Sequence, residues 1–242
     1  MNLKQFFLVV EQNKHEEIIG ESDLGVIEEF KDSVIYDEEA LYTSQRTTRL
    51  SIEFAISVLE DVYFNTGYIY FIEDKIQNKR VKVQVPNLLI DEVDCFVSVP
   101  VLKVHVMTNI TLSMKNLWGC YPDTMRCLHH KYLSRKLTLL TKVIDPKIVI
   151  IDGMYALNGH GPMYGEAIKT DLLVTANNPV IADTIGSELM GIPVSNVEHI
   201  SFAEKEGLGT TDLSNLYCND DWKKYSMQFQ VNKTLIDSLS TI

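Results

Sequence analysis

Two lysines, a histidine and an asparagine lie close together in the chain, just after an apolar stretch: Lys103, His105, Lys115 and Asn116. The stretch before them, residues 94–99, is apolar enough to predict a buried strand. Ammonium and imidazole groups are costly to bury without partners, and α/β sheets place ligand-binding groups at the carboxyl ends of strands. The group therefore predicts a site for a carboxylate or phosphate. Taken singly, a solvent lysine and a structural histidine remain the alternatives.

Asp152 and the glycine-rich stretch after it form the second candidate group. Asp152 is expected to end an apolar strand at residues 147–152, a position that suits a general base, a metal ligand or a ribose-binding carboxylate. Glycines after the strand predict backbone amides that a ligand can approach closely. An irregular turn is the alternative, because the spacing fits neither the dinucleotide fingerprint nor a P-loop. The candidates in this stretch are Gly159, Gly161, Pro162 and Gly165.

Imidazole and carboxylate side chains suggest a third possibility, a divalent-metal site. No H-E-x-x-H or H-x-x-x-H spacing joins these residues, so structural roles are the favoured alternative. The G-x-S-x-G motif of a serine hydrolase is also absent. The possible ligands are His105, His129, His130, His160, Asp152 and Asp183.

The elements that must position these groups alternate between strand and helix. Apolar runs predict strands at residues 6–10, 68–72, 81–85, 94–99, 147–152 and 172–176. Helical periodicity predicts helices at residues 22–30, 48–62 and 125–143, from residue 179, and after residue 195. This alternation predicts an α/β fold with a mostly parallel or mixed sheet flanked by helices. We expect one domain over residues 1–242, with residues 1–50 left without an assignment.

Capping residues predict where three of the helices begin. Asn178 followed by Pro179 is a strong helix start, and Ser195 with Glu198 fits a capping box. Thr108 or Thr111 is expected to cap the helix that carries Lys115 and Asn116.

Composition and charge narrow the classes of partner. The net charge of −11 argues against nucleic acid or an anionic membrane as a partner of the whole surface. Residues 103–142 hold seven Lys or Arg and one acid, whereas residues 11–39 hold eleven acids and two lysines. Two interpretations stay open: the two segments neutralise each other or face solvent, or the basic one forms a pocket for an anion.

The cysteines and the hydropathy exclude further classes. The four cysteines form no C-x-x-C pair, so we expect no iron–sulfur cluster bound by this chain alone and no disulfide framework. No apolar run is long enough to cross a bilayer, and the first residues are too briefly apolar for a secretory signal. These features predict a cytoplasmic protein.

Several motifs in a fixed order resemble the domain-of-unknown-function family numbered 362. They are P-V-L-K-V-H at 100–105, T-x-x-x-K-N-L-W-G at 111–119, I-V-I-I-D-G at 148–153, G-H-G-P-M-Y-G at 159–165 and N-x-P-V-I-A-D at 177–183. The resemblance covers about residues 80–210. It implies an α/β domain whose characteristic residues are Lys103, His105, Lys115, Asn116, Asp152, Gly159, Gly161, Pro162 and Asp183.

The chain departs from that family in two respects. Val101 replaces the first lysine of the family motif, and Val104 replaces its threonine. Many relatives also carry ferredoxin-like cysteine motifs, which this chain lacks. The ligand specificity and the iron–sulfur label of the relatives are therefore not transferred to it.

Three functions remain as hypotheses. In the preferred one, Lys103 and Lys115 bind the charge of a small anion, Asn116, Asp183 and the glycine loop complete the pocket, and His105 or Asp152 transfers a proton. The second is a non-catalytic accessory or redox-partner module that docks an iron–sulfur protein through its basic segment. The third is a divalent-metal enzyme.

Overall fold

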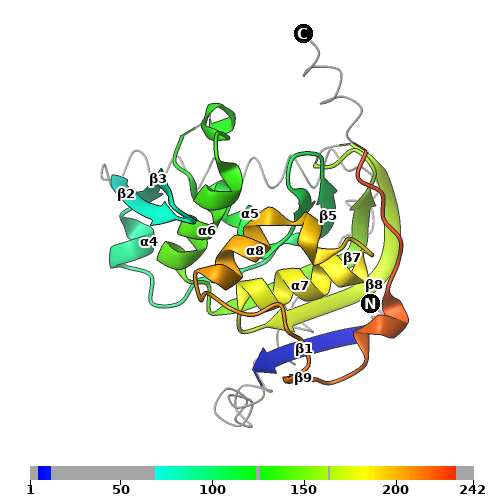
Figure 1. The fold of residues 1–242 in the computed structure, drawn as a ribbon. Coiled ribbons are helices and arrows are strands. Elements are labelled where there is room, and N and C mark those ends of the chain that lie inside the picture. Colours follow the sequence, from blue (N-terminus) through cyan, green and yellow to red (C-terminus); the bar gives the residue numbers. More distant parts are fainter. Residues whose placement is uncertain (1–4, 12–68, 124–125, 163, 233–242) are drawn as a thin grey trace.

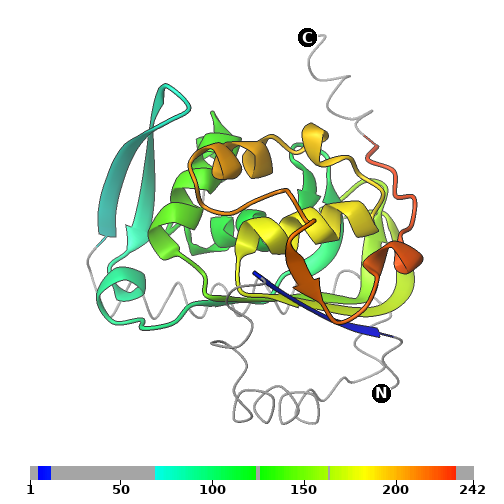
Figure 2. The ribbon, with the colours of Figure 1, turned by 60° about the horizontal axis from the view of Figure 1, so that its bottom comes forward.

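The computed structural model describes residues 5–11 (backbone only), 69–123, 126–162 and 164–232. A seven-stranded mixed sheet forms the base, and helices α5, α7 and α8 lie over one of its faces (Figure 1). The turned view in Figure 2 shows the same two layers, with the separate hairpin β2–β3 at one end. This arrangement confirms the predicted α/β fold with a mixed sheet.

The large sheet has the order β6-β5-β7-β8-β1-β9, and β4 also pairs with β7. Its pairs β5–β7, β4–β7 and β1–β8 are parallel, and β5–β6, β7–β8 and β1–β9 are antiparallel. The strands are β1 (Gln5–Glu11), β4 (Val97–Ser98), β5 (Val101–His105), β6 (Asn109–Thr111), β7 (Ile148–Asn158), β8 (Glu166–Ala176) and β9 (Leu216–Cys218).

Three strand predictions have the wrong length, among them that at residues 172–176, where β8 begins already at Glu166. The strand expected at residues 94–99 is reduced to Val97–Ser98, and β5 follows Pro100, which has no N–H to donate to a ladder. The strand expected to end at Asp152 continues to Asn158, because residues 153–158 pair with β8 in a long hairpin. Cross-strand pairing, which the sequence pattern does not show, decides all three lengths.

Five α-helices are present among the described residues. They are α4 (Leu88–Asp91), α5 (Ser113–Asn116), α6 (Leu133–Ile144), α7 (Pro179–Leu189) and α8 (Glu198–Lys205). Short 3-10 turns complete the helical part: η3 (Leu117–Cys120), η4 (Arg126–His129), η5 (Val194–Asn196) and η6 (Trp222–Tyr225). The helices predicted at residues 22–30 and 48–62 lie outside the described residues.

The helix starts were predicted with mixed success. The start of α7 is confirmed, because the side chain of Asn178 accepts the amides of Val180 and Ile181. The capping box at Ser195 is wrong: α8 begins after Val197 with no side-chain cap. The helix expected from residue 125 begins only at α6, because Tyr132 has a left-handed φ of 59° that ends any earlier helical turn.

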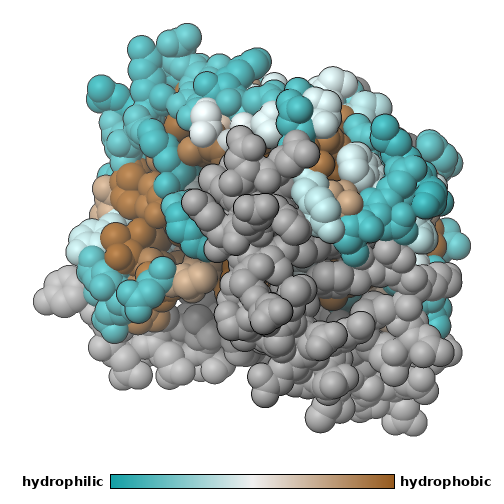
Figure 3. All heavy atoms as spheres, turned by 90° about the horizontal axis from the view of Figure 1, so that it is seen from below, coloured by the Kyte–Doolittle hydropathy of each residue, from teal (hydrophilic) through white to brown (hydrophobic). Residues whose placement is uncertain are grey.

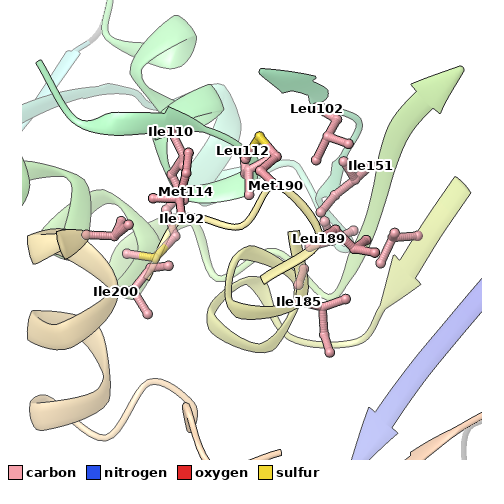
Figure 4. Close-up of a cluster of buried hydrophobic side chains, with 14 of the residues drawn as sticks. Leu102, Ile110, Leu112, Met114, Ile151, Ile185, Leu189, Met190, Ile192 and Ile200 are labelled. Carbon is pink, nitrogen blue, oxygen red and sulfur yellow. The ribbon is translucent and has the colours of Figure 1, made fainter. Parts of the chain in front are cut away.

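The main core fills the space between the sheet and the helices. Figure 4 shows Leu102 and Ile151 from the sheet facing Ile185 and Leu189 of α7. All four side chains are fully buried. Complete burial of such apolar groups is the main source of stability for this layer.

The β2–β3 hairpin builds a second cluster. Strands β2 (Ile69–Ile76) and β3 (Lys79–Pro86) turn at Gln77 and Asn78, whose φ values of 46° and 62° suit a two-residue hairpin. This confirms the two strands predicted around a polar turn. One face of the hairpin packs on α6 and η3, through a cluster that includes Val81, Val83, Leu117, Leu137 and Leu140.

Seen from below, apolar atoms gather on one part of the surface (Figure 3). Exposed apolar side chains of the described residues include Phe71, Val97, Val99 and Ile148. None of the helices in the described ranges combines the length and hydropathy that a bilayer span requires.

Candidate functional site

Strand β5 carries two of the predicted site residues on one face. Lys103 and His105 alternate along β5 with Leu102 and Val104, which are buried in the main core beneath α7. Successive side chains of a strand point to opposite faces, so Lys103 and His105 lie on the face turned away from that core. Thr111 of β6 pairs with Lys103 and lies on the same face.

A carboxylate from α7 holds the short helix that carries Lys115. Asp183 is fully buried, and its two oxygens accept the backbone amides of Ser113 at 2.7 Å and Met114 at 3.0 Å. These are the first amides of α5, which no residue of its own segment caps. The prediction that Thr108 or Thr111 caps this helix is therefore wrong.

The two lysines and the histidine lie close enough to influence one another electrostatically. Burial lowers the pKa of Lys103, and burial, with the charges of Lys103 and Arg126, lowers the pKa of Lys115 to about 8. Burial and then the charges of Lys115 and Lys103 lower the pKa of His105 to about 3. Because the charges of Lys103 and Lys115 both act on His105, we treat these three side chains together as the cationic cluster, defined as Lys103, His105 and Lys115.

Neither ammonium group of the cationic cluster forms a hydrogen bond or an ion pair with another residue in the described part of the chain. Their pKa values are lowered because the desolvated charges lack a counterion there. Two hydroxyl groups nearby are also buried without a hydrogen bond: Thr111 Oγ1, beside Lys103 on the sheet, and Ser113 Oγ, two residues before Lys115. The site is thus rich in unused donors.

His105 is held as a neutral imidazole with a defined tautomer. The backbone amide of Met107 donates to His105 Nδ1 at 3.1 Å. With its pKa near 3, the ring carries one proton at neutral pH, and that proton must lie on Nε2. Nε2 is therefore a hydrogen-bond donor, suited to binding an anion oxygen and not to accepting a proton.

His199 is a residue of this site that the sequence did not reveal. It lies on α8, is 0% exposed, and neither ring nitrogen has a hydrogen-bond partner in the part of the chain that the structure describes. Burial, with the charge of Lys115, lowers its pKa to about 3. A single histidine on a helix gives no local signal, because only the packing of α8 against its neighbours brings it near Lys115.

The glycine loop packs against β5. A Cβ on Gly161 would lie 1.9 Å from the carbonyl oxygen of Val104, and the Gly161 carbonyl accepts the amide of Val106 at 3.1 Å. Only glycine permits this approach. Pro162 follows Gly161 through a cis peptide bond. The structure therefore places the glycine loop directly against β5, the strand that carries Lys103 and His105.

The amide of Gly159 is not free for a ligand, in contrast to the prediction. It donates to Gln230 at 3.0 Å, and the Gly159 carbonyl accepts the amide of Asn232 at 3.0 Å. The segment after η6 thus takes up the backbone groups that a ligand was expected to use.

Asp152 and Asn116 occupy different surroundings from those expected. Asp152 lies within β7, not at its end, and pairs with Val101 of β5, next to a shift of the β5–β7 register that precedes Lys103. Its Oδ1 accepts the amide of Met154 at 2.9 Å. Asn116 is exposed at the end of α5.

The proposed metal ligands do not form a chelating group within the described ranges, where no three His, Cys, Asp or Glu side chains could hold one ion. His160 Nε2 instead lies 3.0 Å from Asn232 Nδ2, and His129 Nε2 lies 2.7 Å from Asp123 Oδ2. The four cysteines are free thiols.

The fold and this site define an α/β protein with a partly buried cationic cluster near the end of one sheet strand. The chain belongs to the family described as Domain of unknown function (DUF362), whose model matches residues 12–188. The match begins well before residue 80, where the motif resemblance begins.

One curated relative is the thylakoid-associated protein sll1697 of Synechocystis sp., which is 27% identical over 127 residues. The aligned residues are 50% of this chain and 40% of the relative, so less than half of the relative is covered. No solved structure matches the chain.

Burial explains one departure from the family motif. Val104, which replaces a threonine, is 0% exposed in the main core, where a hydroxyl would need a partner. The structure gives no corresponding reason for Val101.

Proposed function

We propose that this protein binds a small anion, a carboxylate or a phosphate, at the cationic cluster formed by Lys103, His105 and Lys115. The observation that carries the proposal is the desolvation of two half-buried lysines, Lys103 and Lys115, without a counterion among the described residues. Burying one charge unpaired is expensive, and placing two like charges together adds repulsion. A bound anion would relieve both costs.

The donors of the site can be divided by role. Lys103 and Lys115 would supply the charge, whereas the neutral Nε2–H of His105 and the hydroxyl of Thr111 would fix the orientation of the anion. Neutral donors discriminate by geometry because a misplaced ligand leaves them unsatisfied. This division favours a planar or tetrahedral anion over a monatomic one.

Lys115 is the best candidate for a proton-transferring group in this site. Its pKa of about 8 lies near neutral pH, where a lysine exchanges its proton most effectively. His105 fits this role less well, since Nδ1 is engaged by Met107. Asp152, which pairs with Val101 of β5, is the second candidate for proton transfer.

Thermal unfolding with and without an anion tests the proposal. The wild-type protein would be compared with the variant Lys103→Met/Lys115→Met in phosphate, in oxalate and in a chloride buffer of the same ionic strength. At anion concentrations about 100-fold above Kd, we expect a stabilisation of about 2.7 kcal/mol, or about 5–10 °C in Tm.

In the double variant this anion-dependent shift should vanish while the Tm in chloride stays equal or rises, because unpaired buried charges are removed. The matched control is Lys147→Met/Lys205→Met, which removes two exposed lysines and should keep the shift. An anion-dependent shift that survives in the Lys103→Met/Lys115→Met variant would refute the proposal.

A further inference from the structure

A second basic site lies between the β2–β3 hairpin and the segment that leads into α6. The structure has a groove there with a volume of about 340 Å³. Four cationic side chains line it: Arg80, Lys82, Lys131 and Lys136. None of the residues of the cationic cluster is among its described lining residues, so it is a separate site. We call it the hairpin groove.

The charged side chains that line the hairpin groove are basic, and one lining histidine, His129, lies 2.7 Å from the carboxylate of Asp123. No aspartate or glutamate is found among the described residues that line it. Arg80 pairs with Glu73 at 3.1 Å, and Lys136 Nζ donates to the carbonyl of His129 at 2.6 Å. Lys82 and Lys131 have no hydrogen bond or ion pair with other described residues. At least two lysines are therefore available for an anion.

Aromatic rings lie beside these lysines. Lys82 Nζ lies 4.5 Å from the ring centre of Phe71, and Lys131 Nζ lies 5.5 Å from that of Tyr132. Phe71 is 60% exposed and Tyr132 is 40% exposed, so both rings remain open to solvent beside the groove. An exposed phenylalanine on a surface strand contributes little to folding, which makes it a candidate for ligand contact.

The start of α6 adds to the positive character of the groove. This helix of 12 residues begins at Leu133, between the groove residues Tyr132 and Lys136. It has no side-chain cap and no acidic residue in its first turn. The first amide, that of Leu133, donates to the carbonyl of His130 at 2.9 Å, so the contribution of α6 to phosphate binding is that of its dipole alone.

We propose that the hairpin groove binds a mononucleotide, with its phosphate on Lys82, Lys131 and Lys136 and its base against Phe71 or Tyr132. Lysines without carboxylate partners can bind the phosphate. The exposed aromatic rings can stack on the planar base, which inorganic phosphate lacks. The groove volume lies within the roughly 300–1,000 Å³ range of small-ligand sites. The net charge of −11 disfavours a nucleic-acid polymer.

Titration calorimetry of the full chain would test this assignment with three probes: adenosine 5′-monophosphate, adenosine and inorganic phosphate. We expect the monophosphate to bind to the wild type more tightly than either fragment. The variant Lys82→Met/Lys131→Met should weaken its binding by about tenfold or more. Phe71→Leu should weaken the monophosphate by about fivefold or more and leave inorganic phosphate unchanged.

Lys223→Met is the matched control, because Lys223 also lies over an aromatic ring, that of Trp222 at 5.8 Å, but does not line the groove. It should bind the monophosphate like the wild type. The Lys103→Met/Lys115→Met variant should lose the phosphate binding assigned to the cationic cluster but keep the monophosphate binding that depends on Lys82, Lys131 and Phe71, which separates this proposal from the anion site.

Three results would overturn the proposal. The first is no binding of the monophosphate, or equal binding by the wild type and the Lys82→Met/Lys131→Met variant. The second is loss of monophosphate binding in the Lys103→Met/Lys115→Met variant alone, which would place the nucleotide at the cationic cluster. The third is a single-stranded oligonucleotide that binds far more tightly than the monophosphate, which would indicate a nucleic-acid surface.

Discussion

Asp183 on α7 accepts the backbone amide of Ser113 at 2.7 Å, although the two residues are 70 positions apart in the chain. The second carboxylate oxygen binds the next amide, that of Met114. The helix of only four residues that carries Lys115 is thus held by a side chain of the main core. Asp183 is a positioning residue for the cationic cluster.

Replacing Asp183 by asparagine should loosen α5. An amide side chain offers one oxygen acceptor in place of two, so at least one buried backbone N–H loses its partner. We expect a loss of about 2–4 kcal/mol in the free energy of unfolding and a loss of the anion-dependent Tm shift. Urea unfolding and the thermal assay measure the two effects.

Thr184→Val on the same helix is the control for this change. It removes a bond from Thr184 Oγ1 to the carbonyl of Val180, within α7, and leaves the two bonds from Asp183 to α5 in place. The anion-dependent shift should persist in this variant. An intact shift in Asp183→Asn would contradict the positioning role.

Anion binding should weaken as the pH rises through about 8. The ammonium of Lys115 binds the anion, and its pKa of about 8 means that it loses its proton above that pH. The affinity should then fall by up to about tenfold per pH unit. The unbound protein should instead gain stability between pH 8 and 10.5, because there the unfolded chain holds the proton that the folded chain has lost.

Calorimetry from pH 6.5 to 9.5 measures this dependence. Lys115→Arg keeps its charge over the whole range, so its affinity should stay level above pH 8. The role of Lys115 would be disproved by a wild-type affinity that is constant up to pH 9.5.

His199 should make the protein sensitive to acid. Its pKa is lowered to about 3 by burial and by Lys115, so it is neutral in the folded protein and protonated in the unfolded chain below about pH 6.5. Stability is therefore lost as the pH falls from 6.5 towards 3, with a slope of about 1.4 kcal/mol per unit from this residue. In His199→Leu that contribution should disappear.

Urea unfolding at pH 7.5, 6 and 5 measures the difference between the two proteins. At pH 7.5 the variant should be as stable as the wild type or more stable, since both ring nitrogens of His199 are buried without partners. Equal slopes for the two proteins would show that His199 does not titrate in this way.

Gly161→Ala should displace the glycine loop from β5. The added Cβ would meet the carbonyl oxygen of Val104, a backbone atom that cannot move aside without shifting the strand. We expect a loss of about 1–3 kcal/mol. The comparison is Gly119→Ala, where a Cβ would meet nothing within 4 Å and should change stability little. Thermal unfolding distinguishes the two, and equal effects would contradict the close contact.

Local signals in the sequence were sufficient for several elements. The start of α7 depends on Asn178 and Pro179, which act on amides two or three residues away. The β2–β3 hairpin follows from two alternating strands and a polar turn. The α/β fold also follows from the alternation of strands and helices, and the types and spacing of Lys103, His105 and Lys115 were enough to propose them as site residues.

The tertiary structure decided what these residues do together. The length of β7, the cap that Asp183 provides for α5, the contact of Gly161 with Val104 and the approach of His199 to Lys115 all join distant parts of the chain. A local pattern carries no information on such pairs, because their energy arises only when the sheet and helices pack. The hairpin groove is of the same kind, since its charges and rings come from β2, β3 and the start of α6.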